Sequence, residues 1–220
     1  MRLTPKPSSR LPDSKEYRRA ALGLATAARQ SRFRSAILSS ATGGEGTTSA
    51  AVNIGLHLMG DCGLNPLLIE INRVRPSLTR LFELDDQKSL AAMVSGGGSA
   101  MQYVQRTPAG LSVIPVGPAD NASPLISRLE STLCHAVQEL QNSFDFILLD
   151  APAILESSDV MIAGRVVPQL VLVVGAGQSS QESLSRACQE LKEARITLIG
   201  TILNSRKRII PGWIDRYLQH

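Results

Sequence analysis

Short apolar runs alternate with helical segments along most of this chain. Six runs have the length and hydrophobicity of buried strands: residues 35–38, 67–71, 111–116, 144–150, 170–174 and 197–203. The pattern predicts helices at residues 16–29, 50–59, 76–84, 89–94, 123–141, 158–166 and 180–194. Strands that are apolar on both faces and alternate with helices are typical of a mostly parallel sheet. We therefore predict one three-layer α/β domain, with helices on both faces of the sheet.

The turn between the first predicted strand and residues 50–59 is rich in glycine. Its sequence, SSATGGEGTTS over residues 39–49, joins a short strand to a helix. Successive backbone N–H groups of such a turn converge on an anion, and the helix N-terminus adds partial positive charge. The turn therefore predicts a nucleotide phosphate loop, and the candidate binding residues are Gly43, Gly44, Glu45, Gly46, Thr47, Thr48 and Ser49.

One residue of this loop departs from the P-loop pattern. The pattern has Lys after its last glycine, where it reaches the β- and γ-phosphates, and this chain has Thr47 there. Loss of that charge is expected to slow phosphoryl transfer by orders of magnitude, while backbone amides remain for binding. Arg73, Arg75 or a residue of a partner subunit are hypotheses for the missing charge.

Acidic residues stand at or near the ends of two other predicted strands. Asp150 ends the run 144–150, and Glu70 lies near the end of the run 67–71. The carboxyl ends of parallel strands form one ligand-binding edge, so both should converge on the glycine-rich loop. We predict that Thr48 and Asp150 hold Mg²⁺, with Glu70 a weaker catalytic candidate. The alternative for Asp150 is a simple turn residue.

Composition and charge narrow the possibilities further. Of the 220 residues, 43% are hydrophobic and 19% charged, and no apolar run approaches the ~20 residues of a membrane span. The cysteines and histidines are isolated, so a metal site of that kind is not expected. The net charge of +4 comes from basic residues at both ends, without interleaved aromatic residues, so nucleic acid is not an expected partner. Without a signal peptide, the chain is expected in the cytoplasm.

The same charge distribution divides the chain into three parts. We expect a flexible basic tail at 1–13, the α/β domain at 14–205 and a basic amphipathic tail at 206–220. Two interpretations of the last segment remain open. It is either a helix docked on the core or a segment that contacts a membrane or a partner, with Trp213 as its interfacial anchor.

Five segments, in this order, resemble the bacterial tyrosine kinases of capsule and exopolysaccharide synthesis: residues 40–46, 75–78, 110–117, 144–152 and 199–204. The resemblance covers residues 14–205 and implies the MinD/ParA-like branch of P-loop ATPases. It implies ATP or ADP and Mg²⁺ as cofactors, and a membrane chain-length (co-polymerase) protein of polysaccharide export as partner. A peripheral position at the inner membrane follows from the same resemblance.

The resemblance also assigns roles to single residues. Asn204 matches the asparagine that contacts the adenine edge, although a turn residue at the strand end is the alternative. Glu16 and Arg19 match the first two members of the Glu-x-x-Arg-x-x-Arg oligomerisation motif, whose third place is taken by Leu22. The sequence therefore leaves undecided whether the protein forms a homo-oligomer.

Three departures from the kinases occur together. Thr47 replaces the Lys, Glu70 and Asn72 replace two aspartates of the second acidic motif, and Tyr217 alone stands near the end of the chain. The loop form Gly-Gly-x-Gly-Thr-Thr also resembles the MinD-like accessory protein of bacterial cellulose synthase, which lacks the same Lys.

We therefore predict a degenerate relative of the kinases. Its function would be to regulate exopolysaccharide biosynthesis or export as a nucleotide-binding or scaffold component with little kinase activity. One alternative is an active tyrosine autokinase, which requires ATP turnover and phosphate on Tyr217, Tyr103 or Tyr17. The other alternative is an interaction protein that binds no nucleotide.

Overall fold

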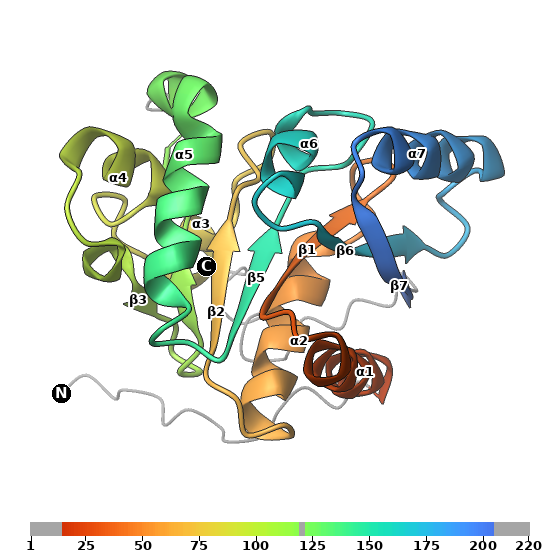
Figure 1. Ribbon diagram of the computed structural model, residues 1–220, viewed down its shortest axis with the longest axis horizontal. Helices are drawn as coiled ribbons and strands as arrows, with labels where there is room; N and C mark the ends of the chain where they lie inside the picture. The colour runs from red at the N-terminus through yellow and green to blue at the C-terminus, as the bar shows by residue number, and fades with distance from the viewer. Residues whose placement is uncertain (1–14, 119–121, 205–220) are drawn as a thin grey trace, which may run out of the picture.

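The computed structural model describes residues 15–118 and 122–204, with side chains from residue 128 onward in the second range. These ranges form one seven-stranded sheet in the order β3-β4-β2-β5-β1-β6-β7 (Figure 1). The strands are β1 Ser35–Ser40, β2 Pro66–Glu70, β3 Gln105–Arg106, β4 Ser112–Ile114, β5 Phe146–Asp150, β6 Gln169–Gly175 and β7 Thr197–Asn204. Every neighbouring pair is parallel except β3 and β4.

Helices connect the strands and cover both faces of the sheet (Figure 1). They are α1 Lys15–Ser31, α2 Thr47–Gly60, α3 Leu78–Phe82, α4 Leu90–Gly96, α5 Ala122–Leu140, α6 Asp159–Gly164 and α7 Gln181–Glu193, with a 3₁₀ turn, η1, at Ala100–Tyr103. The α/β fold, the mostly parallel sheet and the three layers predicted from the sequence are confirmed.

The core lies in two layers because successive strand residues point to opposite faces. In β5, Ile147 and Leu149 pack with residues of α4 to α7 on one face. Phe146 and Leu148 pack with α1, α2 and α3 on the other face. This alternation explains why the central strands are apolar throughout.

The strand β3 was not predicted. It has two residues, Gln105 and Arg106, which pair antiparallel with Val113 and Ser112 of β4. Neither residue is apolar. A turn joins the two strands, and in it the main-chain N–H of Gly110 donates to the carbonyl of Thr107 (2.8 Å). No hydrophobic pattern marks such a strand, so only the fold reveals it.

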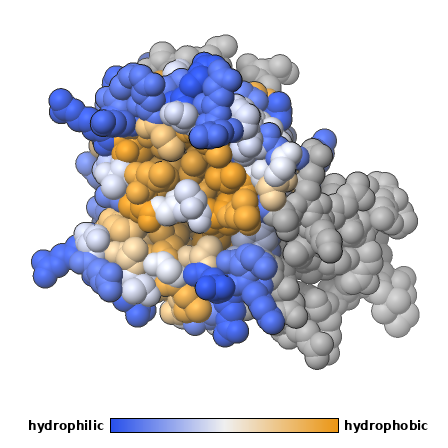
Figure 2. All heavy atoms as spheres, turned by 90° about the vertical axis from the view of Figure 1, so that its right-hand side faces the viewer, coloured by the Kyte–Doolittle hydropathy of each residue, from blue (hydrophilic) through white to orange (hydrophobic). Residues whose placement is uncertain are grey.

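At the opposite edge of the sheet, β7 leaves apolar side chains in contact with solvent. Leu198 is 40% exposed and Leu203 is 66% exposed. Figure 2 shows an apolar area on the side of the molecule where β7 and α7 lie, bordered by hydrophilic residues. Within the described ranges, no helix is long and apolar enough to cross a membrane. The predicted tails at 1–13 and 206–220, including Trp213 and Tyr217, lie outside the described residues.

Candidate functional site

The glycine-rich loop joins the end of β1 to the start of α2, as the sequence predicts. Gly44 and Gly46 have φ angles of +85° and +86°, a left-handed conformation that glycine adopts without a Cβ penalty. The main-chain N–H of Ala50 donates to the carbonyl of Gly46 (2.9 Å), which closes the first turn of α2. The earlier N–H groups of α2 have no partner within the helix, and the helix dipole favours an anion there. The loop therefore has the backbone form of a phosphate site.

Glu45 ties this loop to the end of β6. Its Oε1 accepts from the main-chain N–H (2.9 Å) and the hydroxyl (2.7 Å) of Thr42. Its Oε2 accepts from the N–H of Gly175 (2.8 Å) and the hydroxyl of Ser179 (2.5 Å). Burial acts to raise the pKa of Glu45, but these hydrogen bonds outweigh it and lower the pKa below its usual value. The side chain therefore braces the loop, and its predicted nucleotide contact stays a prediction.

Asn204, the last residue of β7, holds the loop from another side. Its Nδ2 donates to the carbonyl of Glu45 (2.8 Å), and its Oδ1 accepts from the hydroxyl of Tyr17 in α1 (2.9 Å). Burial, with a smaller contribution from Glu16, raises the pKa of Tyr17, so the hydroxyl keeps its proton. The amide is thus bonded within the protein, and the contact with adenine stays a prediction.

Asp150 ends β5 beneath the loop and is fully buried. Neither carboxylate oxygen has a hydrogen-bond partner of regular geometry among the described residues. Burial, followed by the charge of Glu70, raises the pKa of Asp150 to about 8, while the hydroxyl of Thr48 acts in the opposite direction. Buried carboxylates normally have partners, so an unpartnered one suits a bound cation. The structure brings Thr48 and Asp150 together, with Glu70 beside Asp150. A hydroxyl and a carboxylate are oxygen ligands that fit Mg²⁺.

Glu70 lies beside Asp150 in the register of β2 and β5. Its Oε1 accepts from the N–H groups of Ser77 (2.7 Å) and Leu78 (3.0 Å), and its Oε2 accepts from the N–H of Val116 (3.2 Å). Burial raises the pKa of Glu70, and these hydrogen bonds offset part of that effect. The carboxylate therefore joins the start of α3 and the segment after β4 to β2. Its weaker predicted role in catalysis stays a prediction.

The two arginines that follow β2 have different surroundings. Arg73 Nη2 lies 2.6 Å from Asp159 Oδ1, and both side chains are largely buried. Arg75 is 61% exposed and lies over the loop, with Nη2 3.7 Å from Oε1 of Glu156. That same Oε1 accepts from the main-chain N–H of Gly43 (2.8 Å). Glu156 was not a predicted site residue, because nothing in its local sequence marks it.

The remaining predicted residues lie in α1 or at the start of α2. Glu16 and Arg19 are exposed in the first turns of α1, so their predicted role in oligomerisation stays a prediction. Thr47 is buried at the start of α2, and Ser49 is exposed in the same turn.

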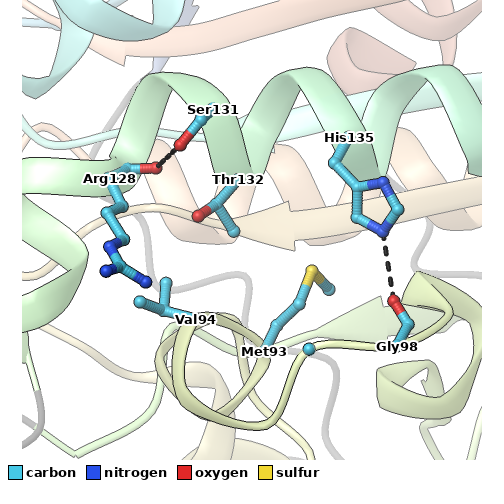
Figure 3. Close-up of a pocket in the computed structure, with 8 residues that line it drawn as sticks. Met93, Val94, Gly98, Arg128, Ser131, Thr132 and His135 are labelled. Atoms are coloured by element: carbon cyan, nitrogen blue, oxygen red, sulfur yellow. Dashed lines mark hydrogen bonds between the residues drawn. The ribbon is translucent and has the colours of Figure 1, made fainter.

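A separate hollow of about 320 Å³ lies between α4 and α5. Figure 3 shows Arg128, Ser131, Thr132 and His135 of α5 across from Met93 and Val94 of α4. His135 Nε2 lies 3.1 Å from the carbonyl oxygen of Gly98, and a dashed line marks this contact in Figure 3. None of the lining residues belongs to the glycine-rich loop, β1 or β5, so the hollow is not part of the candidate phosphate site.

Comparisons with known proteins agree with this geometry. The chain is 27% identical over 197 residues to the tyrosine-protein kinase YwqD of Bacillus subtilis, covering 89% of this chain and 82% of that protein. The BceF tyrosine kinase domain superposes with a TM-score of 0.73 and 26% identity, covering 86% of this chain and 76% of that one. Cobyrinic acid a,c-diamide synthase of Mycobacterium smegmatis, solved with an ATP analog and magnesium, superposes with a TM-score of 0.63 and 19% identity, covering 78% and 71%.

The resemblance to bacterial tyrosine kinases is thus confirmed, and a family match is more specific still. The family described as cellulose biosynthesis protein BcsQ matches residues 34–206, which include the glycine-rich loop and Asp150. Because this match covers well over half of the chain, the protein belongs to the cellulose biosynthesis protein BcsQ family.

Proposed function

We propose that this protein binds ATP or ADP with Mg²⁺ and regulates bacterial exopolysaccharide biosynthesis or export, with little kinase activity of its own. The observation that carries the proposal is the buried carboxylate of Asp150, whose oxygens have no hydrogen-bond partner of regular geometry among the described residues, beside a loop with the backbone form of a phosphate site. The backbone of Gly44 and Gly46 would hold the phosphates, and Thr48 and Asp150 would hold Mg²⁺. The metal would neutralise phosphate charge at the position where Asp150 supplies a carboxylate.

The surroundings of the loop support weak phosphoryl transfer. Thr47 supplies no positive charge where a P-loop has its Lys. Glu70 already accepts three main-chain hydrogen bonds, so it is poorly placed to act as a base. Transition-state charge would therefore have fewer stabilising groups than in a complete kinase site.

The tyrosines support the same proposal. Tyr17 and Tyr103 are buried, and their hydroxyls donate to Asn204 and to the carbonyl of Gly97. Both hydroxyls are engaged in hydrogen bonds within the fold, which disfavours either tyrosine as a phosphate acceptor. Autophosphorylation would therefore depend on Tyr217, which lies outside the described residues.

The family and the relatives support the machinery in which we propose that this protein acts. The family is named for cellulose biosynthesis, and the relative YwqD is named as a tyrosine kinase. We place the protein at the inner face of the inner membrane, beside a membrane chain-length or co-polymerase protein, with a homo-oligomer as a further possibility. The exposed apolar residues of β7 offer a surface for such a contact.

Calorimetric titration of the full chain with Mg-ATP and Mg-ADP tests the proposal, with phosphate release followed in parallel. We expect binding with little turnover, and weaker Mg²⁺-dependent binding by D150N. Rapid turnover with phosphate on Tyr217 would support the autokinase instead. Binding of neither nucleotide would support an interaction protein that has kept only the fold.

A further inference from the structure

We infer that Arg75 contacts the terminal phosphate of the bound nucleotide in place of the missing P-loop Lys, and that Glu156 competes with that phosphate for the loop. The inference rests on the proposed nucleotide binding and adds to it a binding residue and an internal competitor. It is carried by the position of both side chains over Gly43. A Cβ atom on Gly43 would lie 2.5 Å from Glu156 Oε1 and 2.6 Å from Arg75 Nη1.

The backbone after β5 fixes the position of Glu156. The main-chain N–H of Ile154 donates to the carbonyl of Ser40 (2.8 Å), and that of Leu155 donates to the carbonyl of Ala41 (3.2 Å). This segment therefore runs alongside the start of the loop and delivers the carboxylate of Glu156 to the N–H of Gly43 (2.8 Å). Loop N–H groups are the groups that hold phosphate oxygens in P-loop proteins. Glu156 thus occupies an anion position with the protein's own carboxylate.

Arg75 is held near the same position by its backbone and only loosely by its side chain. Its main-chain N–H donates to Oδ1 of Asn72 (3.0 Å). Its side chain is 61% exposed, and Nη2 lies 3.7 Å from Oε1 of Glu156, a distance longer than a direct hydrogen bond. A guanidinium presents several donors in a plane that matches phosphate geometry. Arg75 can therefore exchange the carboxylate for a phosphate without breaking a buried contact.

Arg73, the other arginine near the loop, does not fit this role. Its side chain is paired with the almost fully buried Asp159 at 2.6 Å. Moving Arg73 to a phosphate would leave the carboxylate of Asp159 buried without its charge partner, which is strongly unfavourable. The two arginines therefore divide into a structural one, Arg73, and a ligand-binding one, Arg75.

Glu156 and a bound phosphate compete because both would accept from the same donor, the main-chain N–H of Gly43. A phosphate oxygen and the carboxylate of Glu156 cannot both accept from the N–H of Gly43, and their like charges repel. Binding therefore requires Glu156 to withdraw while Arg75 turns to the phosphate. A P-loop Lys reaches the β- and γ-phosphates, so a cation that replaces it favours a triphosphate over a diphosphate.

Calorimetric titration with Mg-ATP and Mg-ADP tests this on the full chain. R75A should weaken Mg-ATP binding about 10- to 100-fold, the range for one charged hydrogen-bonded contact, and weaken Mg-ADP binding less. R80A is the matched control, because Arg80 is an exposed arginine on α3, and it should leave both affinities unchanged. E156Q should tighten Mg-ATP binding about 3- to 10-fold by removing a nearby like charge. E130Q is its control, since Glu130 pairs with Arg165.

A second variant separates a direct contact from a general loss of positive charge. T47K returns a Lys to the loop, so adding R75A to it should cost much less affinity than R75A alone. Equal Mg-ATP affinities of the wild type and R75A would overturn the inference and leave nucleotide binding intact. A wild type that binds neither nucleotide would overturn the proposed function as well, so the two failures are distinguishable.

Discussion

The side chain of Asn204 donates a hydrogen bond to the main-chain carbonyl of Glu45 at 2.8 Å, across 159 positions of the sequence. Asn204 is the last residue of β7, and Glu45 lies in the glycine-rich loop. The hydroxyl of Tyr17 donates to the same Asn204 side chain, so α1 joins the contact. Elements from the two ends of the described chain therefore meet behind the loop and help to fix its shape.

N204A should destabilise the protein by about 1–3 kcal/mol, because the Glu45 carbonyl and the Tyr17 hydroxyl both lose their partner. Chemical denaturation measures the change, and Y17F, which removes only the tyrosine bond, should have a smaller effect. If Asn204 instead contacts adenine, as predicted from the sequence, the same variant should give a different result. If N204A weakened nucleotide binding without lowering stability, the residue would act on the ligand rather than on the loop.

Two glycines of the loop should respond differently to alanine. Gly46 has a φ of +86°, and a Cβ there would overlap the side-chain amide of Asn204, so G46A should destabilise the fold by about 1–3 kcal/mol. Gly43 is not among the glycines with positive φ, and its Cβ would meet only the ends of the Arg75 and Glu156 side chains. G43A should therefore change the melting temperature less, yet alter Mg-ATP affinity. Equal melting temperatures for the two variants would contradict this prediction.

Asp150 should make stability depend on pH. Its pKa of about 8 in the folded chain lies above its ordinary value of 3.8, so the folded chain binds more protons between those values. The contribution to stability is fully present below pH 3.8 and is lost as the pH rises through 8. D150N cannot titrate, so its stability relative to the wild type should increase between pH 6 and pH 9. Denaturation of both proteins across this range measures the difference.

Mg²⁺ provides the control for that experiment. A cation beside Asp150 favours the ionised carboxylate, so Mg²⁺ should raise the melting temperature of the wild type more at pH 8 than at pH 6. D150N should not show this increase. Parallel pH curves for the wild type and D150N would mean that Asp150 is not the group that titrates.

The fold was readable from the sequence because its central strands are buried on both faces. Runs such as 146–149 are apolar at every position, and the glycines at 44 and 46 mark a turn with left-handed residues. The convergence of Asp150 on the loop followed from one rule, that parallel strands end at the same edge. Patterns confined to a few consecutive residues were therefore sufficient for the architecture and for the loop.

Other features of the site depend on contacts between distant residues. Glu156 reaches Gly43 across 113 positions, and Glu70 reaches the N–H of Val116 across 46. No local periodicity encodes which carboxylate accepts from which main-chain N–H. The sequence likewise left Arg73 and Arg75 as equal candidates for the missing charge, because both lie in the same short loop after β2. The structure separates them, because the side chain of Arg73 is largely buried and that of Arg75 is exposed.

The difference in burial between Arg73 and Arg75 gives a prediction about the free energy of unfolding. R73A would leave Asp159, which is 2% exposed, without its partner, and an uncompensated buried charge typically costs about 3–5 kcal/mol. R75A removes an exposed side chain whose ion pair is long, so its effect on stability should stay within about 0.5 kcal/mol. Urea denaturation of both variants measures these differences. Adding D159N to R73A should recover part of the loss, because the variant then buries a neutral amide instead of an unpaired carboxylate. If R73A were as stable as R75A, the buried pair would not be structural, and Arg73 would again be a candidate for the phosphate contact.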